Sequence, residues 1–374
     1  MAILGIETVI YCVDDMEKSA DFFEDYGLTL KSRTAGRAHF TLPDNSNVIL
    51  QLRATHPIPG SQIVGLGVHE TVWGVDCEEH LEDMVRRIGT DREVRRDEDG
   101  TAHFVADGGV PMALRLWPRF RMPQTSVDPV NSPGNVNRLN VHRKWINRCI
   151  PKRMMHVVFF VADPGACARF VRERLDFRVS DTQRGFGVYL RADGTMDHHN
   201  IFFYNSHTPF APAKGQTAFS HVNYQVTDLD EIMTGRNYMT RRGWAKSHWG
   251  LGRHRISSAL FHYIPCPAGG EAEYGADSDA LDDNWIPRDF DAMFGFAHWM
   301  HDIPEFWMAG HDWSVGFAEG FVENRGEIEP RPYNVQRDSS GPGLGAQLKE
   351  AAEEQDKAHQ DAANEKASSS LARY

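Results

Sequence analysis

The 374-residue sequence has few cysteines, no long apolar run and no excess of positive charge. Its five cysteines form no CxxC pair, which argues against a disulfide framework and favours a reducing cytoplasm. No stretch approaches the roughly 20 apolar residues of a membrane span, and the N-terminus lacks the pattern of a signal peptide. The net charge of −12, without a basic stripe, argues against a nucleic-acid partner. We therefore expect a cytoplasmic protein with neither membrane nor nucleic acid as a partner.

A strand followed by a helix occurs in similar form in both halves of the chain. Asp15 aligns with Asp163, and the same alignment places Phe22 opposite Phe170 without a gap. Apolar residues at helical spacing follow the strands, and the predicted helices cover residues 16–26, 78–88, 164–175 and 229–241. Other segments alternate apolar and polar residues, which predicts curved antiparallel sheets with helices on one side. The length and the repeat together indicate two or more domains.

Three residues on separate predicted strands have side chains suited to a shared metal ion, namely His156, His221 and Glu273. The runs that contain them are typical of β-strands and cover residues 155–160, 219–224 and 270–275. A polar side chain on a buried strand is costly unless a partner satisfies it. Two imidazoles and one carboxylate can satisfy a divalent ion and leave one face of it open, as in non-haem Fe(II) oxygenases. A lone histidine on an apolar strand is more often a core residue, so the prediction depends on convergence of all three.

Further motifs surround these residues in a recognisable order. They are Asp197-His198-His199-Asn200, Gly252-Arg253-His254, Phe261-His262-Tyr263-Ile264, Pro267-Ala268-Gly269 and Glu273-Tyr274. In this order they resemble the signature of type I extradiol ring-cleavage dioxygenases, of the vicinal oxygen chelate superfamily. The resemblance covers roughly residues 1–290 and is most specific over 150–290. Cys266 departs from the signature, because an acidic or small polar residue is common before the proline.

The resemblance implies an α+β fold of tandem paired βαβββ modules, in which the C-terminal pair of modules cups the metal. It would divide the chain into an N-terminal module pair without metal (1–122), a linker (123–152), a catalytic module pair (153–280), an aromatic-rich extension or lid (281–337) and a polar, disordered tail (338–374). The aromatic residues of the extension either cap a substrate pocket or cover a sheet or subunit contact, and the sequence leaves both open.

The resemblance also implies the roles of six side chains. His156, His221 and Glu273 would bind Fe(II), or alternatively Mn(II), whereas His199, His254 and Tyr263 would be catalytic and contact the substrate. The implied reaction is extradiol (meta) cleavage of a catechol-type diol with O2, within the catabolism of aromatic compounds, by a homo-oligomer. In the first half, our alignment places Thr8, Glu70 and Leu114 at the ligand positions, so that half cannot build the same site.

The chemistry of these side chains agrees with the implied roles. An imidazole that titrates near neutrality can take a proton from a diol and later return one. A tyrosine hydroxyl and a histidine N–H would stabilise a developing oxyanion. Tyr263 precedes Glu273 by ten residues, which predicts a hairpin that brings them together. His198 and His199 would point to opposite faces of a strand, so we prefer His199 as the functional one. We expect only Glu273, and not Glu271, to be a ligand.

Other functions remain open at this stage. The same fold serves glyoxalase-like isomerases, but these generally need a fourth protein ligand, for which Glu70 is the only candidate in the first half. A hydroxyphenylpyruvate-type dioxygenase would place its ligands further apart. A metal-free binding or scaffold protein of the same fold is the third alternative.

Overall fold

The computed structural model describes residues 2–53, 58–119, 125, 127–209, 211–302, 315–319 and 331–333. The predicted tail 338–374, together with Phe306 and Trp307 of the predicted extension, lies outside these ranges. The first half contains two βαβββ modules joined by a short strand. Its elements are β1 (Ile3–Val13), α1 (Met16–Tyr26), β2 (Thr29–Arg33), β3 (Arg37–Thr41), β4 (Asn47–Leu52), β5 (Ile63–Val64), β6 (Gly67–Val75), α2 (Glu78–Ile88), β7 (Arg95–Arg96), β8 (Ala102–Ala106), the 3-10 turn η2 (Asp107–Gly109) and β9 (Val110–Leu116).

The second half repeats this order and adds further elements at its end. Its two modules are β10 (Arg153–Val161), α3 (Pro164–Leu175), β11 (Arg178–Gln183), β12 (Gly187–Arg191), β13 (Ile201–Asn205), and β14 (Thr217–Gln225), α4 (Leu229–Arg241), β15 (Leu251–Arg253), β16 (Leu260–Pro265), β17 (Glu271–Ala276). The added elements are β18 (Arg288–Phe290), α5 (Ala292–Phe296), β19 (Trp299–Met300), β20 (Val315–Glu319) and β21 (Arg331–Tyr333). The predicted tandem βαβββ fold is confirmed, and all four predicted helices have the expected bounds.

Aspartates set the start of three of the four module helices. The carboxylates of Asp15, Asp163 and Asp228 each accept a hydrogen bond from a backbone N–H in the first turn of the following helix, at 2.9, 2.9 and 3.0 Å. Such N-caps satisfy donors that a helix leaves unpaired. The helix α2 instead follows Cys77, whose side chain makes no capping bond. None of the helices in the described ranges has the length and apolar character needed to cross a membrane.

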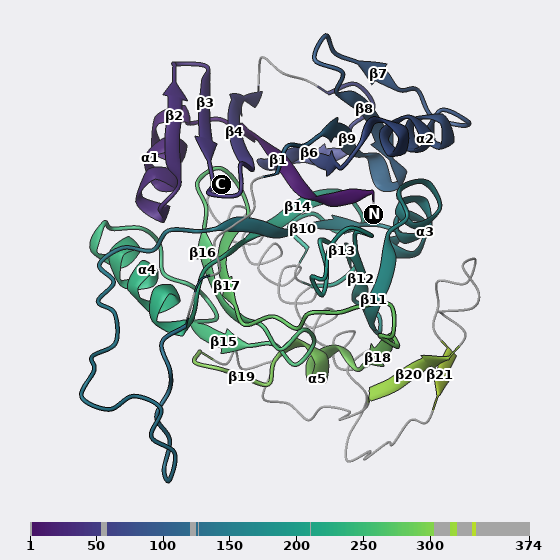
Figure 1. Ribbon diagram of the computed structural model, residues 1–374. Coiled ribbons are helices and arrows are strands. Elements are labelled where there is room, and N and C mark those ends of the chain that lie inside the picture. Colours follow the sequence, from purple (N-terminus) through teal and green to yellow (C-terminus); the bar gives the residue numbers. More distant parts are fainter. Residues whose placement is uncertain are drawn as a thin grey trace, which may run out of the picture.

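Each half forms one curved sheet, with its helices on the outer side (Figure 1). In the described ranges the first sheet has eight strands in the order β2-β3-β4-β1-β6-β9-β8-β7. The second has thirteen, and its central order is β15-β16-β17-β14-β10-β13-β12-β11. The expected antiparallel pairing is wrong at four places, because β1 pairs with β4, β6 with β9, β10 with β13 and β14 with β17 in parallel. In each βαβββ module, the last strand lies beside the first and runs in the same direction.

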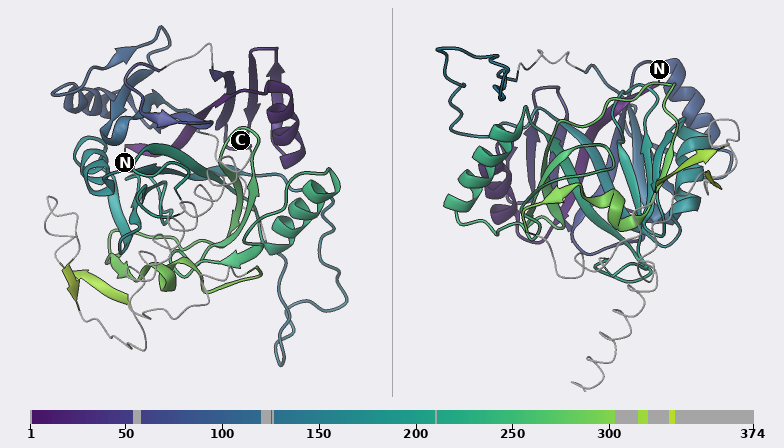
Figure 2. Two further views of the ribbon diagram at one scale, coloured as in Figure 1. Left: turned by 180° about the vertical axis from the view of Figure 1, so that it is seen from behind. Right: turned by 90° about the horizontal axis from the view of Figure 1, so that it is seen from below.

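The two halves lie side by side (Figure 2), and one hydrophobic core cluster contains buried residues of both. The rings of Tyr26 and Tyr274 stack with their centroids 4.0 Å apart, and the Tyr274 hydroxyl donates to the Tyr26 carbonyl at 2.7 Å. Tyr11 meets Tyr224 hydroxyl to hydroxyl at 3.3 Å. The strand β5 of the first half also pairs with β14 of the second. These contacts pack the first half against β14 and β17, and both strands carry predicted metal ligands.

The segments outside the modules differ in structure. The described residues of the predicted linker contain no helix or strand, only an isolated bridge between Ser132 and Asn135. The start of the predicted extension pairs its strand β18 with β11, and β19 with β15, so it closes against the second sheet. The division of the chain into these five segments stays a prediction.

Candidate metal centre

Three adjacent strands of the second sheet bring the predicted ligands together. His156 lies on β10, His221 on its neighbour β14, and Glu273 on the next strand, β17. The Nε2 atoms of the two histidines are 3.3 Å apart, and they lie 3.2 and 3.4 Å from Oε2 of Glu273. The geometric condition on which the sequence prediction depended is therefore met.

The chemistry of this donor set fits a divalent metal ion. Glu273 is fully buried, and neither of its carboxylate oxygens has a hydrogen-bond partner among the described residues. Burial lowers the pKa of His156 and of His221 to about 3, so both rings are neutral at pH 7. Ser220 Oγ lies 3.1 Å from Nδ1 of His221 and can accept a hydrogen bond from an Nδ1–H. In that tautomer, Nε2 of His221 carries the lone pair. Lone pairs and a carboxylate that face one another repel unless a cation lies between them.

A second group of side chains that could bind a metal differs from this site in exposure and in hydrogen bonding. Asp76, Cys77 and His80 sit at the start of α2, where they are exposed or half-buried. Their side chains already hydrogen-bond one another, since Nδ1 of His80 lies 2.7 Å from Asp76 Oδ1 and 3.2 Å from Cys77 Sγ. Nothing there requires an ion.

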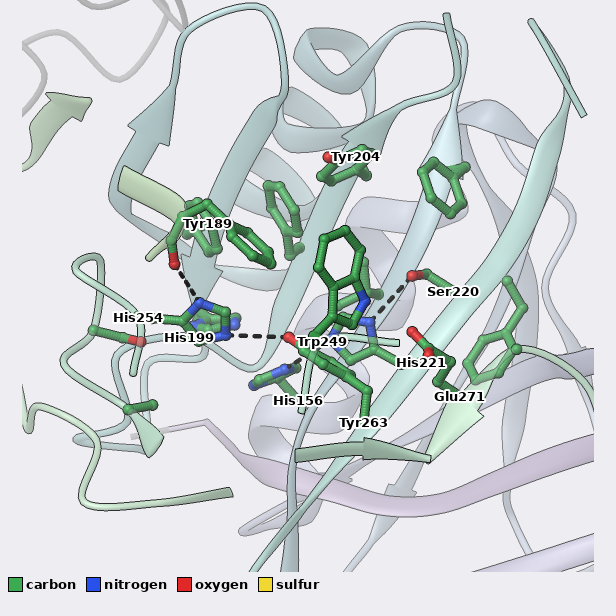
Figure 3. A pocket seen from close by; sticks show the side chains of 18 of the residues that line it. His156, Tyr189, His199, Tyr204, Ser220, His221, Trp249, His254, Tyr263 and Glu271 are labelled. Atoms are coloured by element: carbon green, nitrogen blue, oxygen red, sulfur yellow. Dashed lines mark hydrogen bonds between the residues drawn. The ribbon is translucent and has the colours of Figure 1, made fainter. Parts of the chain in front are cut away.

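A cavity of about 460 Å³ is lined by two of the predicted ligands, His156 and His221 (Figure 3). Its volume is typical of a site for a small organic molecule. The walls are largely aromatic, and they include Phe160, Phe202, Tyr204, Phe219, Trp249 and Phe296. His156, His221, His199, His254 and Tyr263 also line it, so all of the predicted catalytic residues face the same space as two of the ligands. Their catalytic roles remain proposals.

His254 and Tyr263 form one hydrogen-bonded pair. Tyr263 is directly opposite Glu273 in the antiparallel hairpin of β16 and β17, as its ten-residue separation predicted. His254 Nδ1 lies 2.6 Å from the carbonyl of Phe296, which can only accept, so Nδ1 carries the proton. Burial lowers the His254 pKa, and the ring is neutral. Its Nε2 therefore accepts from the Tyr263 hydroxyl at 3.1 Å.

This pairing corrects one expectation. We expected His254 to present an N–H to the substrate, but the N–H of its neutral ring is bound to Phe296. The hydroxyl of Tyr263 is the donor in the pair, and burial together with the Glu273 and Glu271 carboxylates raises its pKa well above the ordinary value. Sequence reasoning missed the Phe296 carbonyl, because backbone groups carry no residue-type signal.

His199 lies just before β13, the strand next to β10, and its ring stacks on that of His156 with centroids 4.0 Å apart. Burial is the main cause of a pKa well below the ordinary value, and neighbouring histidines add to it. Neither His198 nor His199 lies in a strand, so the expected alternation of strand faces does not apply to them. His199 lines the cavity and His198 does not. Their Nδ1 atoms lie 3.1 Å apart.

Glu271 lines the same cavity two residues before Glu273 (Figure 3). In the parallel pairing of β14 and β17 it is level with His221. Burial, and then the Glu273 carboxylate, raise the pKa of Glu271 to about 7. Among the described residues, the group that could hold an ion with His156 and His221 includes Glu273 and not Glu271, and the ligand roles stay a prediction. No pattern in the sequence indicated that Glu271 would nevertheless reach the cavity.

The first half places different residues at the matching positions. Thr8 pairs with Val72 in the first sheet as His156 pairs with Asn223 in the second, so Thr8 is the counterpart of His156. Glu70 and His221 each lie two residues before these partners, so they correspond as well, as predicted. The counterpart of Glu273 is Ala113 rather than Leu114, because Ala113 pairs with Val72. The first half thus has no imidazole at these positions, and its one carboxylate there is that of Glu70.

Comparisons with known proteins agree with this geometry. No family model matches the chain. It is 28% identical over 214 residues to metapyrocatechase 2 of Cupriavidus necator and 28% identical over 174 residues to an iron-dependent extradiol dioxygenase of Rhodococcus jostii. These alignments cover 57% and 43% of this chain, and 64% and 51% of the two relatives, which is less than two thirds of either.

Solved structures show the same fold at low identity. A Mn(II)-bound glyoxalase from Novosphingobium aromaticivorans superposes with a TM-score of 0.63 at 18% identity, over 82% of this chain and 94% of its own. The halotolerant catechol dioxygenase BphC superposes with a TM-score of 0.61 at 17% identity, over 80% and 94%. In sequence and in fold, the chain resembles the extradiol dioxygenases of the vicinal oxygen chelate superfamily.

Proposed function

We propose that the protein is an extradiol ring-cleavage dioxygenase, which uses O2 to open a catechol-type ring at a two-histidine, one-carboxylate metal centre. The observation that carries the proposal is the buried, unpartnered carboxylate of Glu273 facing two neutral imidazoles at the edge of an aromatic cavity. Fe(II) is the proposed metal, with Mn(II) as the alternative, since one relative is named iron-dependent and one structural neighbour holds Mn(II).

His156, His221 and Glu273 would hold the metal. The bound metal would bring the diol and O2 together and supply a path for electrons from the ring to oxygen. The side chains around it would handle protons and charge. A neutral His199 can accept the proton of a diol hydroxyl as the diol becomes a chelating anion. Tyr263, whose high pKa keeps it protonated, can turn its single O–H away from Nε2 of His254 and donate it to an oxygen that gains negative charge. The aromatic walls would hold the ring flat and exclude water.

The cavity also bears on the substrate class. None of the described residues that line it is a lysine or arginine, whereas Glu271 contributes a carboxyl group. A carboxylate on the substrate would find no lysine or arginine side chain to pair with there and would approach Glu271. We therefore propose an uncharged aromatic diol, with apolar substituents that pack against the aromatic walls.

Oxygen consumption by protein loaded with Fe(II) under nitrogen tests the reaction. With catechol, 3-methylcatechol or 2,3-dihydroxybiphenyl we expect oxygen uptake and a yellow ring-fission product. Glu273→Ala should lose both the metal and the activity, whereas His199→Ala should retain the metal and lose turnover. Absence of oxygen uptake with every diol in an iron-containing sample would contradict the proposal.

The substrate class has its own test, with protocatechuate as the charged diol. Glu271→Gln removes the carboxylate and keeps the side-chain shape, so kcat/KM for protocatechuate should rise about tenfold, or ~1.4 kcal/mol. The value for 3-methylcatechol should change little, and it serves as the control. A wild-type protein that prefers the carboxylated diol would refute this part of the proposal.

A further inference from the structure

His198 is completely buried behind His199, and both of its ring nitrogens have a partner. Its Nε2 lies 2.8 Å from Oδ2 of Asp181, and its Nδ1 lies 3.1 Å from Nδ1 of His199. Asp181 is 1% exposed, and its other oxygen, Oδ1, accepts from the backbone N–H of Arg288 at 2.7 Å. The three side chains form a chain of hydrogen bonds that ends at the cavity.

The donors along this chain follow from the chemistry of its first member. A carboxylate only accepts, so Nε2 of His198 carries a proton, and in the neutral form of the ring Nδ1 then carries a lone pair. That lone pair can accept only from a protonated Nδ1 of His199. Because a neutral imidazole has one N–H, Nε2 of His199 on the other edge of the ring is then unprotonated.

We propose that Asp181 and His198 are positioning residues that fix the tautomer of His199, so that its Nε2 is the nitrogen free to take a proton from the substrate. The role of His199 as proton acceptor rests on the proposed function, but its tautomer does not. When the diol binds, its O–H bond breaks, the electron pair stays on oxygen and the proton joins Nε2. The resulting imidazolium keeps its Nδ1–H bond to His198, and Asp181 stabilises the added charge through His198.

The segment after the second module pair holds this relay in place. Its strand β18 pairs with β11, which carries Asp181, and the backbone N–H of Arg288 is the donor to the carboxylate. The indole N–H of Trp285 donates to the carbonyl of Ser180 at 2.7 Å. The start of the extension therefore acts on the site from behind, by orienting Asp181, as well as through Phe296 at the cavity wall.

The substitution Asp181→Asn tests the relay by reversing it. The N–H of Arg288 would keep the amide oxygen at the position of Oδ1, which turns the amide NH2 toward Nε2 of His198. That nitrogen must then accept, so His198 would donate from Nδ1, and His199 would carry its proton on Nε2. We expect kcat to fall at least about 100-fold, with KM and metal content close to wild type.

The matched control is Asp289→Asn, which makes the same chemical change at another buried aspartate of the same strand pair. Asp289 accepts from Thr182 Oγ1 at 2.7 Å and does not line the cavity. Its substitution should leave kcat within a fewfold of wild type. An equal loss in both variants would show that the effect is structural, and it would overturn the proposal.

Nitrogen NMR of protein labelled with 15N-histidine reads the tautomer without turnover, in the metal-free or zinc-loaded protein. We expect Nε2 of His199 to be unprotonated in the wild type and protonated in Asp181→Asn. A wild-type His199 protonated on Nε2 would overturn the relay, whatever the activity. If the wild type consumes no oxygen, the proposed function fails, and the NMR result still decides the tautomer.

A second pair of variants covers the case in which Asp181→Asn does not fold. In His198→Gln the side-chain carbonyl can still accept from Nδ1–H of His199, whereas in His198→Leu no acceptor remains. We expect kcat of the glutamine variant to exceed that of the leucine variant at least tenfold. Equal values for the two folded variants would contradict a positioning role for His198.

Discussion

The two histidines proposed as metal ligands are already deprotonated in the folded protein, and this predicts how metal affinity depends on pH. Burial lowers the pKa of His156 and His221 to about 3. A metal ion competes with protons only for ligands that are protonated when it binds. Protonation of these two histidines should therefore not weaken the affinity of the metal-free protein for Mn(II) when the pH is lowered from 7.5 to 5.5.

The size of the difference makes the test sharp. A histidine with an ordinary pKa near 6.5 is about 90% protonated at pH 5.5, which weakens metal binding roughly tenfold per ligand and roughly 100-fold for two. With a pKa of about 3, less than roughly 1% of each ring is protonated at that pH. Binding should then release almost no protons from these rings, instead of about two.

Titration calorimetry in buffers of different ionisation enthalpy counts the released protons directly, and the electron paramagnetic resonance signal of free Mn(II) gives the affinity. The variant Glu273→Ala should bind no Mn(II) at either pH, which assigns the measured site. A 100-fold loss of affinity at pH 5.5, with nearly two protons released, would refute the reasoning. It would mean that the site opens to water before the ion enters.

Two further predictions concern stability. Burial lowers the pKa of His262 to about 4, below its unfolded value of about 6.5, so its contribution is intact above pH 6.5 and is lost at up to ~1.4 kcal/mol per pH unit as the pH falls toward 4. Urea unfolding of His262→Phe between pH 4.5 and 7 should show a shallower pH dependence than wild type, and an unchanged slope would contradict this. Gly27 has a φ of +109°, and a Cβ there would lie 2.2 Å from the Cys149 carbonyl, so Gly27→Ala should cost at least about 2 kcal/mol. Gly100 has a φ of +85° and open space around it, so Gly100→Ala should cost less in the same unfolding experiment, and equal losses would show that the contact with Cys149 does not matter.

Local signals explain why the helices and the hairpin could be predicted. Asp15, Asp163 and Asp228 cap their own helices within three residues, and the apolar periodicity that follows lies in the same stretch of chain. The facing positions of Tyr263 and Glu273 need only one short turn. Each of these features depends on residues that are close in sequence, so a pattern in the sequence is enough to reveal it.

The parts that escaped prediction all depend on residues far apart in the chain. Asp181 and His198 are 17 residues apart, and the donor to Asp181 comes from Arg288, 107 residues further on. The proton of His254 is fixed by a carbonyl 42 residues away, whose residue type is irrelevant to the bond. The parallel pairings and the choice of Ala113 over Leu114 follow from register between strands, and β-bulges in the pairing of β1 with β6 shift that register.

The difference between the two halves lies in whether buried carboxylates find partners within the protein. In the first half, Glu70 lies 2.9 Å from Nδ1 of His103, and Glu7 accepts from the amide of Asn47 at 3.0 Å. The pKa of His103 is raised despite its burial, because Glu70 favours the protonated ring, so this pair is satisfied without an ion. In the second half, Glu273 faces rings whose pKa is lowered and which offer lone pairs instead of protons. Both halves thus bury carboxylates in their sheets, although on strands that do not correspond, and Glu273 is the one of these three whose neutralisation requires a cation from outside the chain.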